Sequence, residues 1–432
     1  MIIRSLKETK NINISFFQGT NVEIIEILNS WWKENQISSE LALPYKRKPF
    51  QKILELFKYR QITVLSGLRR VGKTTLIYQT IEHLIKEKTN PKNILFFSFD
   101  EKKEEITNLL EEYSSFTNTD WKKEKCYIFL DEIQKLEDWS NKIKIIYDNF
   151  PNLKFTISGS NNLQLERKAI KNLAGRHFNL HVNPLTFEEY LEMKRSPIKL
   201  NELKIWESEI KKEFNNYLYK PYPELVNHEN LNIIKTYIKT SIIDRIVKDD
   251  STFFKGVNEE LLQTLLNIFY EEPGSYLNYD TLSNDLKTSK KTLIPHIAYL
   301  ESAYLIRKVK NYSPNTRKTS KKLQRIYPYH FSLMFGWTGK LNLETIAHTF
   351  FNSNYYWREK QKEVNILDLE NKQAIEVKES TKITSADTKN LEFFSKKFNF
   401  KPVVVYNGRE EETKTGDLII KKTPAWKLYV LA

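Results

Sequence analysis

The sequence has 432 residues, of which 28% are charged and 40% hydrophobic, with one cysteine and a formal net charge of +14. This length allows several domains with sizeable cores, whereas a single cysteine excludes a disulfide scaffold and indicates a reducing, cytoplasmic environment. No apolar run approaches the ~18 residues of a membrane span and the N-terminus turns polar too early for a signal peptide, so we expect no membrane partner.

The first part of the chain predicts an α/β domain. Residues 1–45 are a mixed N-terminal lead, and over residues 46–187 short apolar runs alternate with helical patterns. The runs lie at residues 62–65, 94–97, 127–130 and 155–158, with a fifth candidate at 178–182. Buried strands separated by helices are typical of a parallel sheet that is covered on both faces.

A glycine-rich segment follows the first predicted strand and precedes a predicted helix at 73–87. It matches the GxxxxGK[ST] phosphate loop and consists of Gly67, Leu68, Arg69, Arg70, Val71, Gly72, Lys73, Thr74 and Thr75. In such a loop the backbone N–H groups surround the phosphates, Lys73 reaches the β- and γ-phosphates, and the Thr74 hydroxyl ligates Mg²⁺. The segment therefore predicts ATP and Mg²⁺ as cofactors.

Two acids end the strand predicted at 127–130. We expect Asp131 to support the metal and Glu132 to orient and deprotonate the attacking water. A glutamate in this place favours a hydrolase over a kinase, because a kinase must exclude water.

Two later segments carry further candidates for the same site. The strand at 155–158 ends in small polar residues, and Ser158, Ser160 and Asn161 are all candidates for a γ-phosphate contact. An arginine at position 176 could stabilise charge in the transition state, either in its own subunit or in a neighbouring one. The residues alone decide neither question.

Taken together, these motifs resemble one protein family. The segments that carry the resemblance are residues 65–75, 130–134, 157–161, 174–176 and 184–190. They are similar to the archaeal and bacterial AAA+ ATPases with an RRVGKTT phosphate loop. The resemblance is strongest over residues 61–190. It implies an AAA+ P-loop fold followed by a helical lid at 188–256, a winged helix at 257–335 and a domain like the PD-(D/E)xK nucleases at 336–432, with homo-oligomers as one option.

Residues 278–309 have the helix, turn, helix and strand order of a winged helix, with Ser289 as an N-cap and Pro295 as a feature that counts against an ideal recognition helix. Between Lys287 and Arg325 eleven lysines and arginines accompany one acid, Glu301. This excess predicts phosphate contacts with duplex DNA, although an RNA or an acidic protein stays an alternative. The expected contacts are Lys290 and Lys291 on the helix, and Arg317, Lys318, Lys321 and Lys322 on the wing.

The last domain carries an incomplete nuclease pattern. Its candidate residues are Glu344, Glu363, Asn365, Glu376 and Lys378. Such nucleases hold Mg²⁺ with carboxylates and position water with a lysine, but the expected aspartate is Asn365, a weaker ligand for a hard cation. We therefore expect a nuclease-derived domain that does not cleave DNA. An active ATP-dependent nuclease is an alternative, and it would require Asn365 to serve in place of the expected aspartate.

The sequence as a whole predicts an ATPase that couples ATP binding or hydrolysis to DNA engagement. One alternative is a nucleotide-gated binding protein with little turnover, in which ATP acts as a conformational clamp. Another is an ATPase whose basic face binds RNA or a protein.

Overall fold

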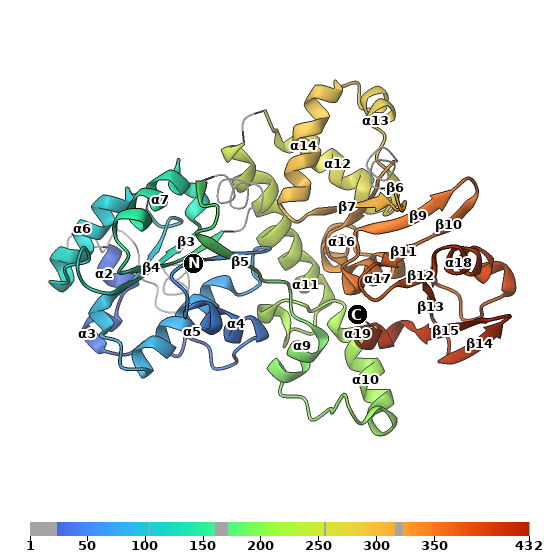
Figure 1. The fold of residues 1–432 in the computed structure, drawn as a ribbon, viewed down its shortest axis with the longest axis horizontal. Coiled ribbons are helices and arrows are strands. Elements are labelled where there is room, and N and C mark those ends of the chain that lie inside the picture. The colour runs from blue at the N-terminus through green and yellow to red at the C-terminus, as the bar shows by residue number, and fades with distance from the viewer. Residues whose placement is uncertain (1–23, 103, 160–171, 255, 316–322, 432) are drawn as a thin grey trace. The chain divides into compact units, whose positions relative to one another are not determined.

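The structure is a computed structural model that describes residues 24–102, 104–159, 172–254, 256–315 and 323–431. The described chain forms two compact units (Figure 1). The first contains the described residues up to Val182 except 67–71, and the second contains residues 67–71 together with those from Asn183 onward. None of the helices in these described ranges is long and apolar enough to cross a bilayer.

The first unit is built on one parallel sheet with the strand order β2-β3-β4-β1-β5. The strands are β1 (Ile62–Ser66), β2 (Ile94–Ser98), β3 (Cys126–Asp131), β4 (Leu153–Gly159) and β5 (His177–His181). Every residue of β1, β2 and β4 is buried, as expected for strands with helices on both faces. The five predicted strands and the parallel α/β core are confirmed.

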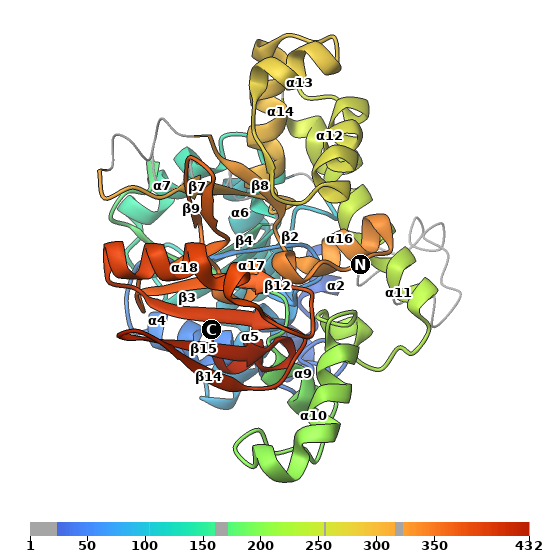
Figure 2. The ribbon, with the colours of Figure 1, turned by 90° about the vertical axis from the view of Figure 1, so that its right-hand side faces the viewer.

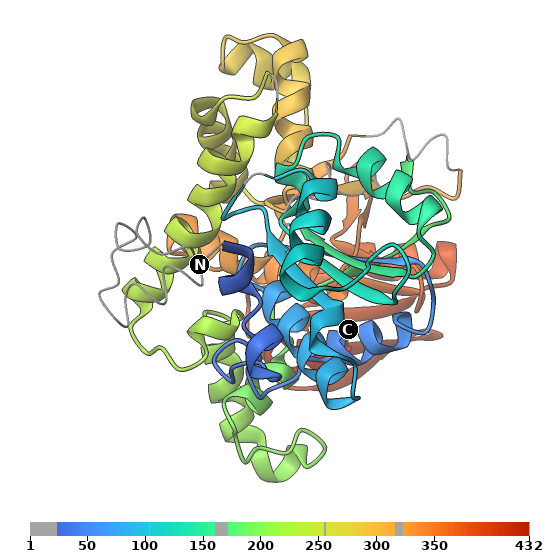
Figure 3. The same ribbon diagram turned by 90° about the vertical axis from the view of Figure 1, so that its left-hand side faces the viewer.

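Within the described residues six helices accompany this sheet, and Figure 3 turns them toward the viewer. They are α2 (Ile24–Leu28), α3 (Trp31–Glu34), α4 (Lys48–Leu56), α5 (Lys73–Lys86), α6 (Ile106–Thr117) and α7 (Trp139–Asn149), with the short turns η2 (Pro91–Asn93) and η3 (Ile133–Lys135). Trp31 and Trp32 both donate their indole N–H to the Ile94 carbonyl. The described end of the N-terminal lead is thus part of the core of the first unit.

The second unit begins with a run of helices. They are α9 (Phe187–Met193), α10 (Leu203–Tyr217), η4 (Pro223–Leu225) and α11 (Leu231–Ile238), after which the chain passes through two π-helical turns, η5 (Lys239–Ile243) and η6 (Arg245–Asp249), into the 3₁₀ turn η7 (Asp250–Phe253). Phe187 and Phe214 share a core with Ile366 and Ile375 of the C-terminal part. Helices α9 and α10 therefore pack on the C-terminal domain, where the sequence predicted a separate lid.

The basic segment folds as α12 (Glu259–Glu271), β6 (Ser275–Tyr276), α13 (Tyr279–Asp285), α14 (Lys290–Ser302), β7 (Ile306–Asn311) and β8 (Arg325–Pro328). Helices α12 to α14 form one end of the second unit (Figure 2). Ser289 caps α14 by accepting a hydrogen bond from the Thr292 N–H. Pro295 lies inside α14, which nevertheless continues to Ser302 because Leu293, Ile297 and Leu300 anchor it in the core.

One sheet crosses the domain boundary that the sequence predicted at residue 335. Its order is β10-β9-β7-β8-β6, with β9 (Tyr355–Glu359) parallel to β7 and β10 (Lys362–Val364) antiparallel to β9. Helices α16 (Phe331–Thr338) and α17 (Leu343–Phe351) connect β8 to β9. The predicted winged helix and the C-terminal domain thus share a sheet.

The C-terminal sheet has the order β11-β12-β13-β15-β14. Its strands are β11 (Ile366–Asp368), β12 (Gln373–Lys378), β13 (Lys401–Tyr406), β14 (Glu411–Thr415) and β15 (Leu418–Pro424), accompanied by α18 (Ser385–Phe398), η8 (Ala425–Lys427) and α19 (Leu428–Leu431). Strands β10 and β11 are neighbours in sequence but belong to different sheets, and they separate at Asn365. There the side-chain amide of Asn365 replaces ladder bonds: its oxygen accepts the Val377 N–H at 3.0 Å.

Candidate nucleotide-binding site

The phosphate loop leaves the carboxyl end of β1 at Ser66 and enters α5 at Lys73. Gly67 and Gly72 have φ angles of 141° and 93°, a region in which an L side chain is strained. These two glycines let the chain curl back, so that the loop meets α5 at its N-terminus, where free N–H groups favour a phosphate. Lys73 is the first residue of that helix and is 5% exposed.

A buried carboxylate lies between the loop and the sheet. The Thr74 hydroxyl donates to one oxygen of Asp131 at 2.8 Å, and the Ser158 hydroxyl donates to the other. Because β3 and β4 are neighbours and both end at this edge, the sheet itself brings Asp131 and Ser158 together. Among the small polar candidates, Ser158 contacts the acid, and Ser160 and Asn161 lie outside the described residues.

The carboxyl of Asp131 is well suited to a cation. Burial raises its pKa, and the neighbouring Glu132 carboxylate raises it further, while the hydroxyls of Ser158 and Thr74 act in the opposite direction. A hydroxyl and a carboxylate oxygen are the hard donors that Mg²⁺ prefers. Thr74 and Asp131 would hold this ion, whose positive charge would favour the ionised carboxylate.

Glu132 occupies a strained position directly after β3. Its φ of 52° and ψ of 42° place it in the left-handed region, which costs a non-glycine residue roughly 1–2 kcal/mol. Its carboxylate accepts a hydrogen bond from the side-chain amide of Gln134, and both residues are almost completely buried. Gln134 stands in the same segment as both acids, but no sequence pattern marked it as a site residue.

Two family models match this chain, one mainly in the first unit and one in the second. Residues 59–191 match the family model described as an AAA domain. This segment contains β1 to β5, so the parallel α/β core of the first unit is similar to AAA-type P-loop ATPases. A second model, a domain of unknown function (DUF8612), matches residues 211–339.

Similar proteins extend beyond the AAA domain. Uncharacterized protein MJ1637 of Methanocaldococcus jannaschii is 28% identical over 288 residues, which are 61% of this chain and 59% of the relative. Uncharacterized protein MJ1544 of the same organism is 26% identical over 372 residues, or 80% of each chain. Among solved structures, the Walker-type ATPase PABY2304 of Pyrococcus abyssi is 16% identical with a TM-score of 0.40, and the match covers 68% of this chain and 96% of that one.

The AAA domain places Arg176 away from the phosphate loop. The Ile62 N–H donates to the Arg176 carbonyl at 2.8 Å, so this arginine lies beside the first residue of β1, whereas the loop follows the last. A strand of five residues is roughly 16 Å long. The Arg176 side chain pairs with Asp148 at 2.7 Å. Arg176 and the phosphate loop thus lie at opposite ends of β1.

Arg69 and Arg70 of the loop, which belong to the second unit, contact acids of that same unit. Arg69 donates two hydrogen bonds to Asp250, at 2.6 and 3.0 Å. Arg70 pairs with Glu224 at 3.0 Å, and Glu224 also accepts a hydrogen bond from the Tyr237 hydroxyl. The motif places both arginines in the loop, but their acidic partners lie more than 150 residues away and follow only from the fold.

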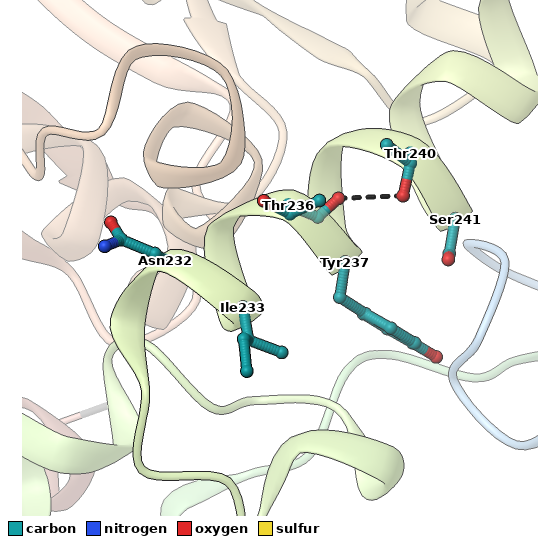
Figure 4. Close-up of a pocket in the computed structure, with 6 residues that line it drawn as sticks. All are labelled: Asn232, Ile233, Thr236, Tyr237, Thr240 and Ser241. Atoms are coloured by element: carbon teal, nitrogen blue, oxygen red, sulfur yellow. Dashed lines mark hydrogen bonds between the residues drawn. The ribbon is translucent and has the colours of Figure 1, made fainter.

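Tyr237 also lines a hollow of ≈ 380 Å³ along α11 and η5. All six lining residues, which are Asn232, Ile233, Thr236, Tyr237, Thr240 and Ser241, come from one face of this continuous helical segment (Figure 4). The hollow is thus distinct from the phosphate loop.

Not all basic residues between Lys287 and Arg325 are exposed and available for a partner. Lys290 and Lys291 are exposed at the start of α14, beside the exposed Ile294, and Lys290 pairs with Asp280. Arg307 is buried, and Lys308 pairs with Glu301 at 2.8 Å. The four predicted wing contacts, Arg317, Lys318, Lys321 and Lys322, lie outside the described residues.

The residues of the nuclease-like pattern lie close together, but their carboxylates contact arginine and lysine side chains. The Asn365 amide donates to Glu344 at 2.9 Å, and Arg325 of β8 forms an ion pair with Glu363 at 2.5 Å. Lys378 pairs with Glu376 at 2.9 Å. No group of three histidine, cysteine or acidic residues suited to a metal occurs in the described part of the chain. Arginine and lysine thus lie where the sequence pattern would need a metal ion.

Proposed function

We propose that this protein is a Mg²⁺-dependent ATPase that couples ATP binding and hydrolysis to engagement of duplex DNA. The observation that carries the first half is the set of hydrogen bonds from Thr74 and Ser158 to the two oxygens of Asp131. This set lies beside the N-terminus of α5, where the P-loop fold binds phosphates.

Each residue of the site has a separate task in the proposed reaction. Lys73 and the N–H groups of the loop hold the β- and γ-phosphates. Thr74 and Asp131 would hold the metal ion, which when bound would neutralise charge on the phosphates. Glu132 accepts a proton from the attacking water. The Gln134 amide keeps the Glu132 carboxylate in one orientation, which favours a single direction of attack.

ATP turnover tests this half of the proposal. Wild-type protein with Mg²⁺ is expected to hydrolyse ATP, Glu132→Gln to bind ATP but lose about 10²-fold or more in kcat, and Lys73→Ala to lose binding. Binding without turnover in the wild type would instead favour the alternative in which ATP acts as a conformational clamp.

The second half rests on the segment from α12 to β8. Its order of helix, strand, two helices and a two-stranded hairpin supports a winged helix, a fold in which the recognition helix enters the major groove. Helix α14 presents Lys290, Lys291 and Ile294 on its exposed side. Lysines provide phosphate contacts, and an apolar side chain beside them can contact a thymine methyl group.

Binding to duplex DNA and to RNA at several salt concentrations tests this half. Lys290→Ala with Lys291→Ala is expected to weaken DNA binding and to make its dependence on salt less steep by about two phosphate contacts. Lys211→Ala with Lys212→Ala is the matched control, because these lysines are also adjacent and exposed on a helix. Equal weakening by both variants, or a preference for RNA, would contradict DNA engagement through α14.

A further inference from the structure

The ion pair between Arg69 and Asp250 joins the phosphate loop to the far end of a helical segment. Both partners belong to the second unit, which includes residues 67–71. The Asp250 side chain is only 6% exposed and that of Arg69 17%. A carboxylate so deeply buried is stabilised by a nearby cation, so losing the contact with Arg69 is unfavourable.

The same helical segment is held at a second point by the next residue of the loop. Arg70 contacts Glu224, its guanidinium carbon lies 5.8 Å from the centre of the Tyr237 ring, and the Tyr237 hydroxyl donates to Glu224. Tyr237 belongs to α11, and Asp250 begins η7 at the other end of the segment. Consecutive loop residues therefore contact both ends of one continuous helix.

Between these two points the helix is not regular. Residues 239–243 and 245–249 form π-turns, which are rare and found mostly as short insertions in α-helices. A π-turn contains one residue more than an α-turn. The same segment could therefore adopt the regular α-helical hydrogen-bonding pattern by a small shift. Asp250 directly follows these turns and would change its direction if one of them became α-helical.

Helix α14 is attached to these turns. The Tyr299 hydroxyl of α14 donates to the Ile246 carbonyl of η6 at 2.6 Å, and its ring lies 4.8 Å from that of Phe254. Burial raises the pKa of Tyr299, and Asp250 raises it further whereas Arg69 opposes this. Tyr299 thus lies in the electrostatic field of the ion pair.

We propose that Asp250 is a positioning residue for the phosphate loop, and that the Arg69–Asp250 pair transmits nucleotide binding through the π-turns and Tyr299 to α14. The inference rests on the proposed nucleotide binding. The phosphates of ATP compete with Asp250 for the Arg69 guanidinium. Because losing the contact with Arg69 is unfavourable for the buried Asp250, the end of the helical segment rearranges, and the Ile246–Tyr299 bond passes this change to α14.

Amide hydrogen exchange, with and without a saturating non-hydrolysable ATP analogue, tests the proposal on the full chain. In the wild type, exchange in residues 239–253 and 290–302 is expected to change by about fivefold or more, the lower range of measured couplings. Asp250→Asn is expected to abolish the change in both segments. Asp249→Asn is the matched control, since Asp249 is adjacent but exposed and pairs with Arg245.

Tyr299→Phe separates the two steps and serves if Asp250→Asn does not fold. It removes the hydroxyl that reaches Ile246, so the response is expected to remain in 239–253 and to disappear in 290–302. A response in α14 that survives Asp250→Asn or Tyr299→Phe would overturn the inference. Analogue binding with no change in α14 of the wild type would overturn the inference alone, whereas no binding would overturn the proposed function and the inference with it.

Discussion

At the scale of single residues, the candidate site combines one buried acid with one strained acid. Asp131 receives two hydroxyl donors, and Glu132 is held by the amide of Gln134 in a left-handed backbone conformation. The two acids are adjacent in sequence, but the turn at Glu132 gives their side chains different partners. Asp131 faces Thr74 and Ser158, and Glu132 faces the short turn η3.

Gln134 gives a prediction at this scale. Gln134→Leu removes the donor to Glu132 but keeps an apolar side chain of similar size, and we expect kcat for ATP to fall by about 10- to 100-fold with little change in KM, because the base is misplaced. Gln134→Glu is expected to be worse, since it sets two carboxylates against each other. Steady-state ATPase kinetics measure both, and a kcat like that of the wild type in the leucine variant would contradict the positioning role.

The sequence could predict which residues gather around the loop but not every contact. Thr74 and Asp131 follow from motif spacing, because the carboxyl ends of parallel strands lie at one edge. The choice among Ser158, Ser160 and Asn161 depends on where β4 ends relative to β3, which is a matter of strand register. Arg176 is a residue that the fold places far from the loop. It directly precedes β5, which runs parallel to β1, so it lies beside the first residue of β1 and not beside the last.

At the scale of elements, the cluster around Asn365 shows how a nuclease-like pattern can be held together without a metal. Asn365 uses its amide nitrogen toward Glu344 and its oxygen toward the Val377 N–H. Arg325 reaches across from β8 to Glu363. These contacts join β8, α17, β10 and β12, so the cluster stabilises the junction of two sheets.

Restoring the missing acid is therefore expected to damage the fold. Asn365→Asp places a carboxylate beside Glu344 and removes a donor, which we expect to cost about 1–3 kcal/mol of unfolding free energy. Asn371→Asp is the matched control, because Asn371 also donates to a carboxylate, Asp368, but is exposed. Thermal unfolding with and without Mn²⁺ measures the effect. A marked stabilisation by Mn²⁺ or DNA nicking in the variant would indicate a recoverable metal site.

Element positions were predictable where the apolar pattern is continuous. All five strands of the AAA domain lie within a few residues of their predicted runs, because burial on both faces demands apolar side chains throughout. The break at Asn365 could not be predicted in this way. Its cause is a hydrogen bond to Val377, twelve residues further along the chain.

At the scale of the whole molecule, the number of basic residues in a segment does not give the number of basic side chains exposed on the surface. Eleven basic residues between Lys287 and Arg325 predicted one basic surface. Folding turns Arg307 into the interior and pairs Arg325 with Glu363, so part of the excess neutralises acids that lie far away in the sequence. A local count of charges cannot register such pairing, because the acids belong to later segments.

The global stability is expected to depend on pH through Glu376. Burial raises its pKa from 4.5 to about 7, with Lys378 lowering it and Glu344 and Glu363 raising it. Between these two values the folded protein binds the proton more tightly than the unfolded chain, so the unfolding free energy falls as pH rises. Denaturant unfolding at pH 4.5 and 7.5 measures this dependence.

Glu376→Gln identifies the source of that dependence. Because glutamine stays neutral, the stability of this variant relative to the wild type is expected to rise by up to ~3 kcal/mol between pH 4.5 and 7.5. Glu370→Gln, at an exposed position, is the control for the loss of a carboxylate. A relative stability of Glu376→Gln that does not change with pH would exclude Glu376 as the source.

The left-handed backbone at Glu132 has a consequence for how this protein can change under selection. Glycine adopts such a conformation without strain, so Glu132→Gly is expected to be about 1 kcal/mol more stable than Glu132→Ala in chemical unfolding, although both variants lose the same carboxylate. Equal stability of the two would show that the position is not strained. A library sorted for thermostability alone would therefore drift toward glycine at position 132, and one sorted for ATP turnover would keep the glutamate.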